Sequence, residues 1–437
     1  MPKAPQKPSL SKRLESLGVK VGTAKLPASQ PDRCFEVDAV VPGAYRSTRH
    51  GETFVAEQRF DATYRHGQAA IQTDIRFDML ADWAQEPRFR ELPIEAYAFL
   101  DVETSGLAGG TGTYAFLVGV GRFLSTDSEA DKRTGTDAGT DKRIKADGQK
   151  VFQLKQFFMR DPAEEAAMLE GLSEFLAPCA ALVTFNGKAF DAPLLTTRYA
   201  LQNVPSPLRD FAHLDLLPLA RRLWRDRLPS RALKYLEENI LSAPRTTEEV
   251  PGYEIPYLYF DYLRTRDARP LKGVFYHNAM DVVAMAALLS HTVTILEDPF
   301  GELVEHGLDV VALAKLFEDL GRWDTAARLF EHGLEMNLPE TDFWTAVQRL
   351  SRLQKRRGDL ETALRLWEQA AGRGQVYAHI ELAKYYEHQC RDYTEALKWT
   401  HSAMSLVAEL NIPRYEYNHW MQELNHRQER LEAKSKI

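Results

Sequence analysis

The feature that most constrains this chain is an apolar segment that ends in two acids. Tyr97-Ala98-Phe99-Leu100 runs directly into Asp101-Val102-Glu103-Thr104. Alternate residues of a strand share a face, so Asp101 and Glu103 point the same way. Two adjacent carboxylates repel each other and are costly to bury without a counter-charge, which a divalent cation supplies. Oxygen ligands favour Mg²⁺ or Mn²⁺. Taken alone, a solvated end of a strand explains the pair as well.

Two later segments carry further acids. In Phe185-Asn186-Gly187-Lys188-Ala189-Phe190-Asp191, the pattern predicts the end of a strand, a glycine turn and the start of a helix. By itself, Asp191 is explained as a helix N-cap. In Tyr276-His277-Asn278-Ala279-Met280-Asp281, His277 and Asp281 are four positions apart and share one helical face. By itself, this pair is explained as a surface contact.

The pattern around these segments predicts an α/β fold. Strands are expected at 97–103, 115–120, 151–158 and 182–185, and the segment 125–150 reads as a solvated hairpin insertion. A helix is expected to begin at Asp161-Pro162. Further helices are expected near 191–201, 215–225, 231–239 and 273–296. Several strands followed by alternating helices and strands predict a mixed sheet flanked by helices.

Composition excludes several other classes of protein. The 437 residues are 44% apolar and 27% charged, with a net charge of −7, which is typical of a globular chain of several domains. We find no signal peptide and no membrane-spanning run, and the three cysteines are far apart. These features predict a cytoplasmic protein without a membrane partner. Residues 1–30 form a basic arm, and residues 31–94 predict a small β-rich lead-in.

After the α/β region, residues 301–437 are predicted to be helical and repetitive. Gly321-Arg322-Trp323-Asp324-Thr325-Ala326 aligns with segments that end at Ala363 and Ala396, so equivalent alanines are 37 and 33 positions apart. This period resembles the tetratricopeptide repeat over about 305–410. Such an array either recruits a protein partner or buttresses the preceding domain, and both interpretations stay open here.

Taken together, the acidic segments resemble the DEDD, or DnaQ-like, 3′-to-5′ exonuclease superfamily, which has the ribonuclease H-like fold. More narrowly, they resemble the YprB-like proteins, which are ribonuclease H-like and often carry tetratricopeptide repeats. The resemblance covers about 95–295 and the helical tail. It rests on the following segments: Asp101 to Leu107 before Gly109-Gly110-Thr111-Gly112-Thr113, Phe185 to Lys188 with Phe190-Asp191, His213 to Leu217, and His277-Asn278 with Asp281.

This resemblance implies a site with two metal ions, Mg²⁺ or Mn²⁺, and the metal ligands would be Asp101, Glu103, Asp191 and Asp281. A Tyr or His on the last helix would orient or deprotonate the attacking water. The superfamily usually has a Tyr four positions before the last Asp, or a His five before. Here His277 is four before and Tyr276 five before. Because the residue four back shares the face of the acid best, we favour His277.

The resemblance also implies contacts to nucleic acid. The candidate residues are Thr104, Asn186, Lys188, Arg225 and Arg231. Asn186 lies five positions before Asp191 instead of the usual four, so we assign it a supporting role. The arginines between 221 and 231 would form either a groove wall for phosphates or a solvated helix face. Asp215 either assists the metal site or caps a helix, and the Gly109–Thr113 segment either approaches a nucleotide or forms a tight turn.

We therefore predict a metal-dependent 3′-to-5′ exonuclease that acts on nucleic acid, DNA or RNA, in single-stranded form. Two alternatives stay open: a ribonuclease H-like endonuclease, and a non-catalytic nucleic-acid-binding scaffold that uses its repeats. Four repelling acids argue against the scaffold because they are costly to hold together without a metal.

Overall fold

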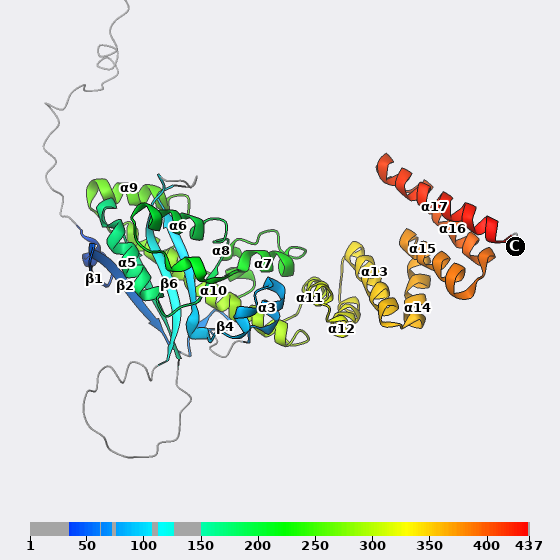
Figure 1. Cartoon of the computed structure of the whole chain (residues 1–437), viewed down its shortest axis with the longest axis horizontal. Coiled ribbons are helices and arrows are strands. Elements are labelled where there is room, and N and C mark those ends of the chain that lie inside the picture. The colour runs from blue at the N-terminus through cyan, green and yellow to red at the C-terminus, as the bar shows by residue number, and fades with distance from the viewer. Residues whose placement is uncertain (1–34, 62, 72–75, 107–111, 126–149, 436–437) are drawn as a thin grey trace, which may run out of the picture.

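The computed structural model describes residues 35–61, 63–71, 76–106, 112–125 and 150–435. A body built on a β-sheet is followed by a row of helices that extends away from it (Figure 1). The basic arm predicted at 1–30 lies outside the described residues. The same holds for most of the Gly109–Thr113 segment and for the insertion between Ser125 and Lys150. These last two residues pair with each other, so the insertion connects the strands of a hairpin, as predicted.

The main sheet is mixed and has seven strands in the order β1-β2-β7-β6-β5-β8-β9. Neighbouring strands from β1 to β5 in this order are antiparallel, whereas β8 is parallel to β5 and β9 to β8. The strands are β1 (Gly43–Thr48), β2 (Gly51–Phe60), β5 (Tyr97–Thr104), β6 (Ala115–Ser125), β7 (Lys150–Phe158), β8 (Ala181–Thr184) and β9 (Ala212–Asp215). A separate small hairpin joins β3 (Arg65–His66) to β4 (Ala69–Ala70). The mixed sheet predicted from the sequence is present, and the lead-in at 31–94 supplies two of its strands.

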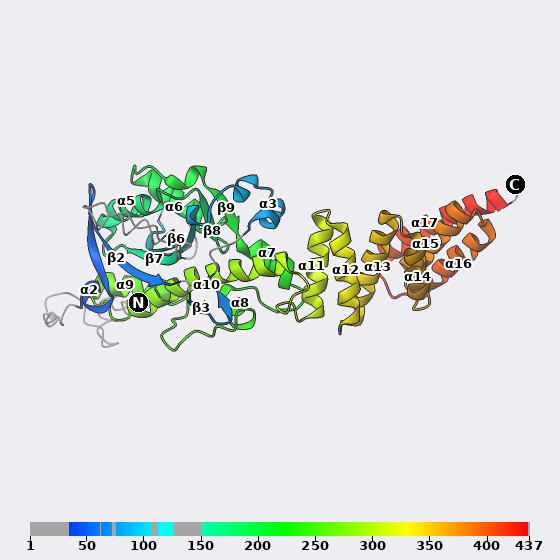
Figure 2. The ribbon, with the colours of Figure 1, turned by 90° about the horizontal axis from the view of Figure 1, so that it is seen from below.

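Helices cover both faces of this sheet (Figure 2). Two separate apolar clusters lie between these helices and the strands. One cluster packs under α5 (Glu165–Leu176), α6 (Asp191–Leu201) and α9 (Ile255–Thr265). The other packs under α3 (Asp78–Ala84), α7 (Leu216–Trp224), α8 (Leu233–Asn239) and most of α10 (Leu271–Glu297). Shorter helices are α2 (Val37–Val40), η2 (Pro87–Arg90), η3 (Ile94–Ala96), η4 (Pro162–Glu164) and η5 (Pro207–Asp210). The sequence predicted neither α9 nor β9.

Helix α10 is a long apolar run, although the sequence was predicted to contain no run that could span a membrane. By length and composition it is long enough to cross a membrane, but 78% of its most apolar window is buried inside the protein. Its residues Val282, Val283, Met285 and Leu289 are buried in the apolar cluster beneath the sheet. The physical reason for its composition is therefore a central position in the core, where every face meets another element.

The C-terminal region consists of antiparallel helix pairs, and their turns explain the repeat in the sequence. Gly321 and Gly358 have φ of 72° and 86°, a left-handed conformation that glycine adopts without steric cost. Arg391 occupies the equivalent turn with φ of 56°. The helices are α11 (Gly307–Asp319), α12 (Trp323–Glu335), α13 (Glu340–Arg357), α14 (Leu360–Ala371), α15 (Val376–Tyr385), the π-helical turn η6 (Tyr386–Cys390), α16 (Tyr393–Glu409) and α17 (Arg414–Ser435). The aligned alanines, Ala326, Ala363 and Ala396, are fully buried.

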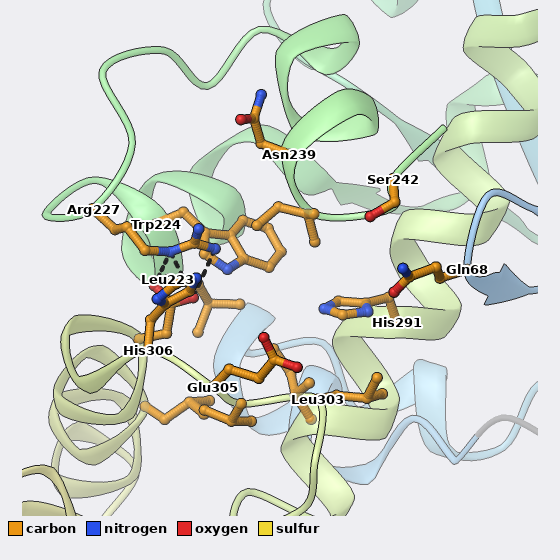
Figure 3. A pocket seen from close by; sticks show the side chains of 15 residues that line it. Gln68, Leu223, Trp224, Arg227, Asn239, Ser242, His291, Leu303, Glu305 and His306 are labelled. Atoms are coloured by element: carbon orange, nitrogen blue, oxygen red, sulfur yellow. Dashed lines mark hydrogen bonds and ion pairs between the residues drawn. The ribbon is translucent and has the colours of Figure 1, made fainter. Parts of the chain in front are cut away.

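The helical row is joined to the sheet-containing body through α7 and α11. The Nε of Arg227 donates to both carboxylate oxygens of Asp309 at 2.9 Å, which links the two regions. Beside this contact lies a cavity of about 130 Å³, into which His291 and Gln68 project (Figure 3). The first helix pair is thus packed directly against the α/β body.

Candidate active site

The three acidic segments meet at one end of the sheet. Strands β5 and β8 are parallel neighbours, so the segments that follow them emerge at the same edge. Asp101 and Glu103 lie near the end of β5, and Asp191 is the first residue of α6, which follows β8. Helix α10, which carries His277 and Asp281, packs against β5 and β6. The topology therefore brings together all five residues that the sequence singled out as catalytic.

The acids perturb one another strongly. Burial, and then the charge of Asp281, raises the pKa of Asp101 to about 7. Burial, and then the charge of Asp101, raises the pKa of Asp191 to about 8. The pKa of Glu103 is also raised well above its usual value, chiefly by burial and by Asp101. Raised pKa values in a buried cluster of acids are typical of functional sites. Phe190 occupies the N-cap position of α6 and Asp191 is the first residue of the helix, so the capping explanation for Asp191 is not supported.

His277 lies between the acids, whereas Tyr276 does not. The Nε2 of His277 is 3.5 Å from Asp281 Oδ2 and 4.0 Å from Glu103 Oε1. Its Nδ1 is 3.0 Å from Glu249 Oε1. Burial lowers the pKa of His277, but the hydrogen bond to Glu249 and the neighbouring acids outweigh it and raise the pKa to about 9. The hydroxyl of Tyr276 instead accepts a hydrogen bond from the backbone N–H of Thr246 at 3.0 Å.

A buried amide clamp fixes the position of Asp101. The Nδ2 of Asn278 donates to Asp101 Oδ2 at 2.8 Å, and its Oδ1 accepts from Gln156 Nε2 at 2.9 Å. Gly119 pairs with Asp101 across the sheet and leaves the space that Asn278 occupies. A Cβ at Gly119 would lie 2.2 Å from Asn278 Oδ1. The clamp therefore orients one carboxylate oxygen of Asp101 through side chains from β7 and α10.

Asp281 is paired with a buried arginine, Arg245, which was not among the site residues predicted from the sequence. The side chain of Arg245 is 2% exposed and contacts Glu237, Glu249 and Asp281. Glu237 in turn is 2.6 Å from the Nε2 of His66, so the network extends to β3. His66 therefore has a structural role: it holds the buried carboxylate of Glu237. In the sequence, only the opposite charges of Arg245 and Glu249 between two prolines mark this segment, and they do not point to Asp281.

The turn before Asp191 is held by Asp215. The carboxylate of Asp215 accepts from the backbone N–H groups of Asn186 and Lys188 at 2.8 and 3.1 Å. It also caps α7 by accepting from the N–H of Leu217 at 3.0 Å. Asn186 adopts φ of 68° in this turn. Of the two roles left open for Asp215, the structure shows the capping role, extended to the turn that leads into Asp191.

The predicted nucleic-acid contacts differ in their positions. Lys188 is exposed beside Asp191, whereas the hydroxyl of Thr104 donates to the carbonyl of Gly106 at 2.9 Å. Arg225 is exposed and lies 3.5 Å from Asp226. Asn186 and Arg231 line one hollow next to the site. The structure thus groups Asn186 with Arg231 and leaves Arg225 outside that hollow.

The acids suit a divalent cation in charge and in ligand chemistry. The raised pKa values of Asp101, Glu103 and Asp191 mean that these carboxylates gain from a cation among them, and carboxylate oxygen is the donor that Mg²⁺ and Mn²⁺ prefer. In the part of the chain that the structure describes, no three His, Cys, Asp or Glu side chains already stand in coordinating positions. Arg245 and His277 supply positive charge beside Asp281. Among the described residues, no buried arginine forms an ion pair with Asp101, Glu103 or Asp191.

Comparison with known proteins identifies the family. A family model described as RNase H superfamily matches residues 98–293, which include every acid of the site. The uncharacterized protein YprB of Bacillus subtilis strain 168 is 31% identical over 368 residues, which cover 82% of this chain and 81% of YprB. The chain belongs to the YprB family. It therefore carries a ribonuclease H-like domain, and nucleases of that superfamily generally use divalent metal ions.

One solved structure is also similar to this YprB-family chain. It is the family B DNA polymerase of the hyperthermophilic archaeon Pyrobaculum calidifontis, with a TM-score of 0.30 and 15% identity. The match covers 52% of this chain and 29% of the polymerase chain. A likeness of this size supports no inference about function.

Proposed function

We propose that this YprB-family protein is a metal-dependent 3′-to-5′ exonuclease that hydrolyses phosphodiester bonds of single-stranded nucleic acid by a two-metal mechanism. The observation that carries the proposal is the cluster of Asp101, Glu103, Asp191 and Asp281 within a ribonuclease H-like domain. These acids would hold two Mg²⁺ or Mn²⁺ ions. When bound, the ions would lower the pKa of a water and stabilise the leaving 3′ oxygen.

Asn278 and His277 would have separate roles in the proposed reaction. Asn278 holds one oxygen of Asp101, which leaves the other oxygen for a cation. His277 presents Nε2 toward Asp281 and Glu103 while Glu249 holds Nδ1. Neighbouring acids raise the pKa of His277 to about 9, so cations bound to those acids would lower it again. The neutral imidazole would then accept the proton of the attacking water at Nε2.

The test is a degradation assay with 5′-labelled single-stranded DNA and RNA in Mg²⁺ or Mn²⁺. The purified protein is compared with the nearly isosteric double variant Asp101→Asn/Glu103→Gln, and with Asp324→Asn in the helical region as a control. The Asp324 side chain is 86% exposed and far along the chain from the site. We expect a ladder that shortens from the 3′ end. The double variant should lose more than the roughly 10–100-fold caused by changes to groups that merely orient metal ligands.

Other outcomes of the same assay separate the alternatives. Internal cuts in a circular single strand would establish an endonuclease instead. Absence of cleavage with either metal, together with binding that survives the double substitution, would establish a non-catalytic scaffold. Thermal unfolding of the double variant checks folding, and removal of two repelling charges should leave its stability unchanged or raised.

For the helical region, we propose a tetratricopeptide-like module that binds a protein partner. Support comes from left-handed turns at Gly321, Gly358 and Arg391, each followed by a helix with a buried alanine. An affinity capture with residues 360–437 deleted tests this proposal, because the helices before that point share the apolar core of the α/β body and are kept. A partner bound by the later repeats would be lost from the shortened chain.

A further inference from the structure

A second feature adjoins the acid cluster: a hollow of about 410 Å³ between the turn after β8 and helices α7 and α8. Its volume lies in the roughly 300–1,000 Å³ range of small-molecule sites. The cavity of Figure 3, at about 130 Å³, is much smaller, and its arginine Arg227 is already paired with Asp309. The hollow beside the acids is therefore the better candidate for a ligand site.

The charges that line the hollow lack acidic partners. Five arginines lie between residues 221 and 231, and three of them pair with an aspartate. Arg221 and Arg231, the two that line the hollow, have no carboxylate within 4.0 Å among the described residues. The NH1 of Arg231 donates to the carbonyl of Leu228, and its Nε is buried without a partner. An unsatisfied guanidinium nitrogen in such a place is costly unless an anion accepts from it.

The remaining lining suits a nucleotide. Asn186 contributes a side-chain amide, and the apolar surface comes from Phe185, Leu217 and Leu233. Leu217 and Arg221 are four apart on α7, so they lie on one helical face. Asp215 joins α7 to the turn of Asn186 through the hydrogen bonds described above. This connection fixes the position of Arg221 relative to the turn.

The hollow also lies next to the acid cluster. A Cβ at Gly187 would lie 2.8 Å from Asp191 Oδ2, so the residue after Asn186 touches the acid cluster. One turn thus borders the hollow through Asn186 and the acids through Gly187. A nucleotide chain placed at the acids would have a phosphate within reach of the hollow.

We propose that this hollow is a phosphate-binding subsite for a nucleotide, in which Arg221 and Arg231 hold the phosphate and Asn186 supports it. The proposal rests on the proposed function, because it places the nucleotide beside the nuclease site. Guanidinium groups bind phosphate oxygens in a fork, which a pair of arginines provides here. The phosphate belongs either to the substrate strand or to a free mononucleotide, and the experiment separates these sources.

The experiment measures binding without cleavage. Arg221→Gln and Arg231→Gln are each combined with Asp101→Asn/Glu103→Gln in the full chain. Fluorescence anisotropy gives the Kd of a labelled single-stranded oligonucleotide, and competition gives those of 5′-AMP and inorganic phosphate. The control is Arg264→Gln on α9, whose side chain is 75% exposed and paired with Asp261. We expect each test variant to bind about tenfold more weakly, with a slope of log K against log salt shallower by about 0.7.

The outcomes are distinct. Weakened binding of the oligonucleotide alone places a phosphate of the strand in the hollow, and equal weakening for 5′-AMP assigns the hollow to a mononucleotide. Affinities and salt slopes like those of Arg264→Gln would overturn the proposal even if the protein cleaves nucleic acid. If the wild type does not cleave nucleic acid but both arginine variants bind the oligonucleotide more weakly, the proposed nuclease activity is refuted and the phosphate subsite stands. If Arg231→Gln proves unstable, Arg231→Lys and Arg221→Gln carry the test, because lysine keeps the charge and loses the fork.

Discussion

Replacing Arg245 by methionine tests whether the acid cluster needs an internal counter-charge. The Arg245 side chain is 2% exposed, and its three partners, Glu237, Glu249 and Asp281, are 1%, 10% and 17% exposed. Arg245→Met would leave three buried or nearly buried carboxylates without their shared cation. Removing one partner of a buried pair costs about 3–5 kcal/mol. We therefore expect the free energy of unfolding to fall by about that amount at neutral pH.

The assay is urea unfolding with and without Mn²⁺. A suitable control is Arg198→Met, because Arg198 and Glu165 form an equally buried pair, 4% and 1% exposed, on the other face of the sheet. Both variants should lose several kcal/mol. Mn²⁺ should restore part of the loss in Arg245→Met, since a cation among the acids relieves Asp281. It should restore nothing in Arg198→Met.

The pH dependence gives an independent check. Burial raises the pKa of Glu249, but the hydrogen bond to His277 and the charge of Arg245 hold it below its usual value. A depressed pKa contributes stability above the unfolded pKa, and that stability is lost as the pH falls. The deficit of Arg245→Met should therefore shrink as the pH is lowered and the acids protonate. A loss below about 1 kcal/mol at neutral pH, as for an exposed pair, would refute the reasoning. Equal rescue of both variants by Mn²⁺ would do the same.

Three further predictions concern the acid cluster and its supporting turn. Because the pKa values of Asp101 and Asp191 are raised to about 7 and 8, stability without metal should fall as the pH rises from about 4 to 8. Mn²⁺ affinity should rise over that interval with release of protons, measured by calorimetry in two buffers. Gly187→Ala would place a methyl group 2.6 Å from Thr184 Cβ, so it should cost about 1–3 kcal/mol and weaken Mn²⁺ binding; Gly252→Ala, with open space around it, is the control in urea unfolding. Asp215→Ala removes the acceptor for three backbone N–H groups and should cost about 2 kcal/mol or more, measured by thermal unfolding.

Local patterns in the sequence predicted most of the elements that carry the site. The helices expected near 191–201 and 273–296 are α6 and α10, and the strand expected at 97–103 is β5. Apolar runs and capping residues suffice here because neighbours along the chain decide these elements. Strand β9 is four residues long, and its formation depends on pairing with β8, so no local pattern indicates it. Helix α9 is aromatic on several faces, which obscured its helical period.

The sequence also singled out the side chains of the proposed chemistry. Alternation on a strand put Asp101 and Glu103 on one face, and a spacing of four put His277 beside Asp281. The choice of His277 over Tyr276 followed from the same helical geometry, and the structure places Tyr276 against Thr246. Periodicity is sufficient for these decisions because each compares residues within one element.

Contacts between distant segments were decided by the tertiary structure alone. Arg245 is 36 positions from Asp281, and His66 is 171 positions from Glu237, so no local spacing links them. The same holds for the two arginines at the hollow, which differ from the neighbouring arginines in having no aspartate within 4.0 Å in the described part of the chain. Residue type and spacing determine which interactions a side chain can make. Which charge stands opposite it depends on how the chain brings separate elements together. That packing set the counter-charge of Asp281 and left Arg221 and Arg231 without a carboxylate partner among the described residues.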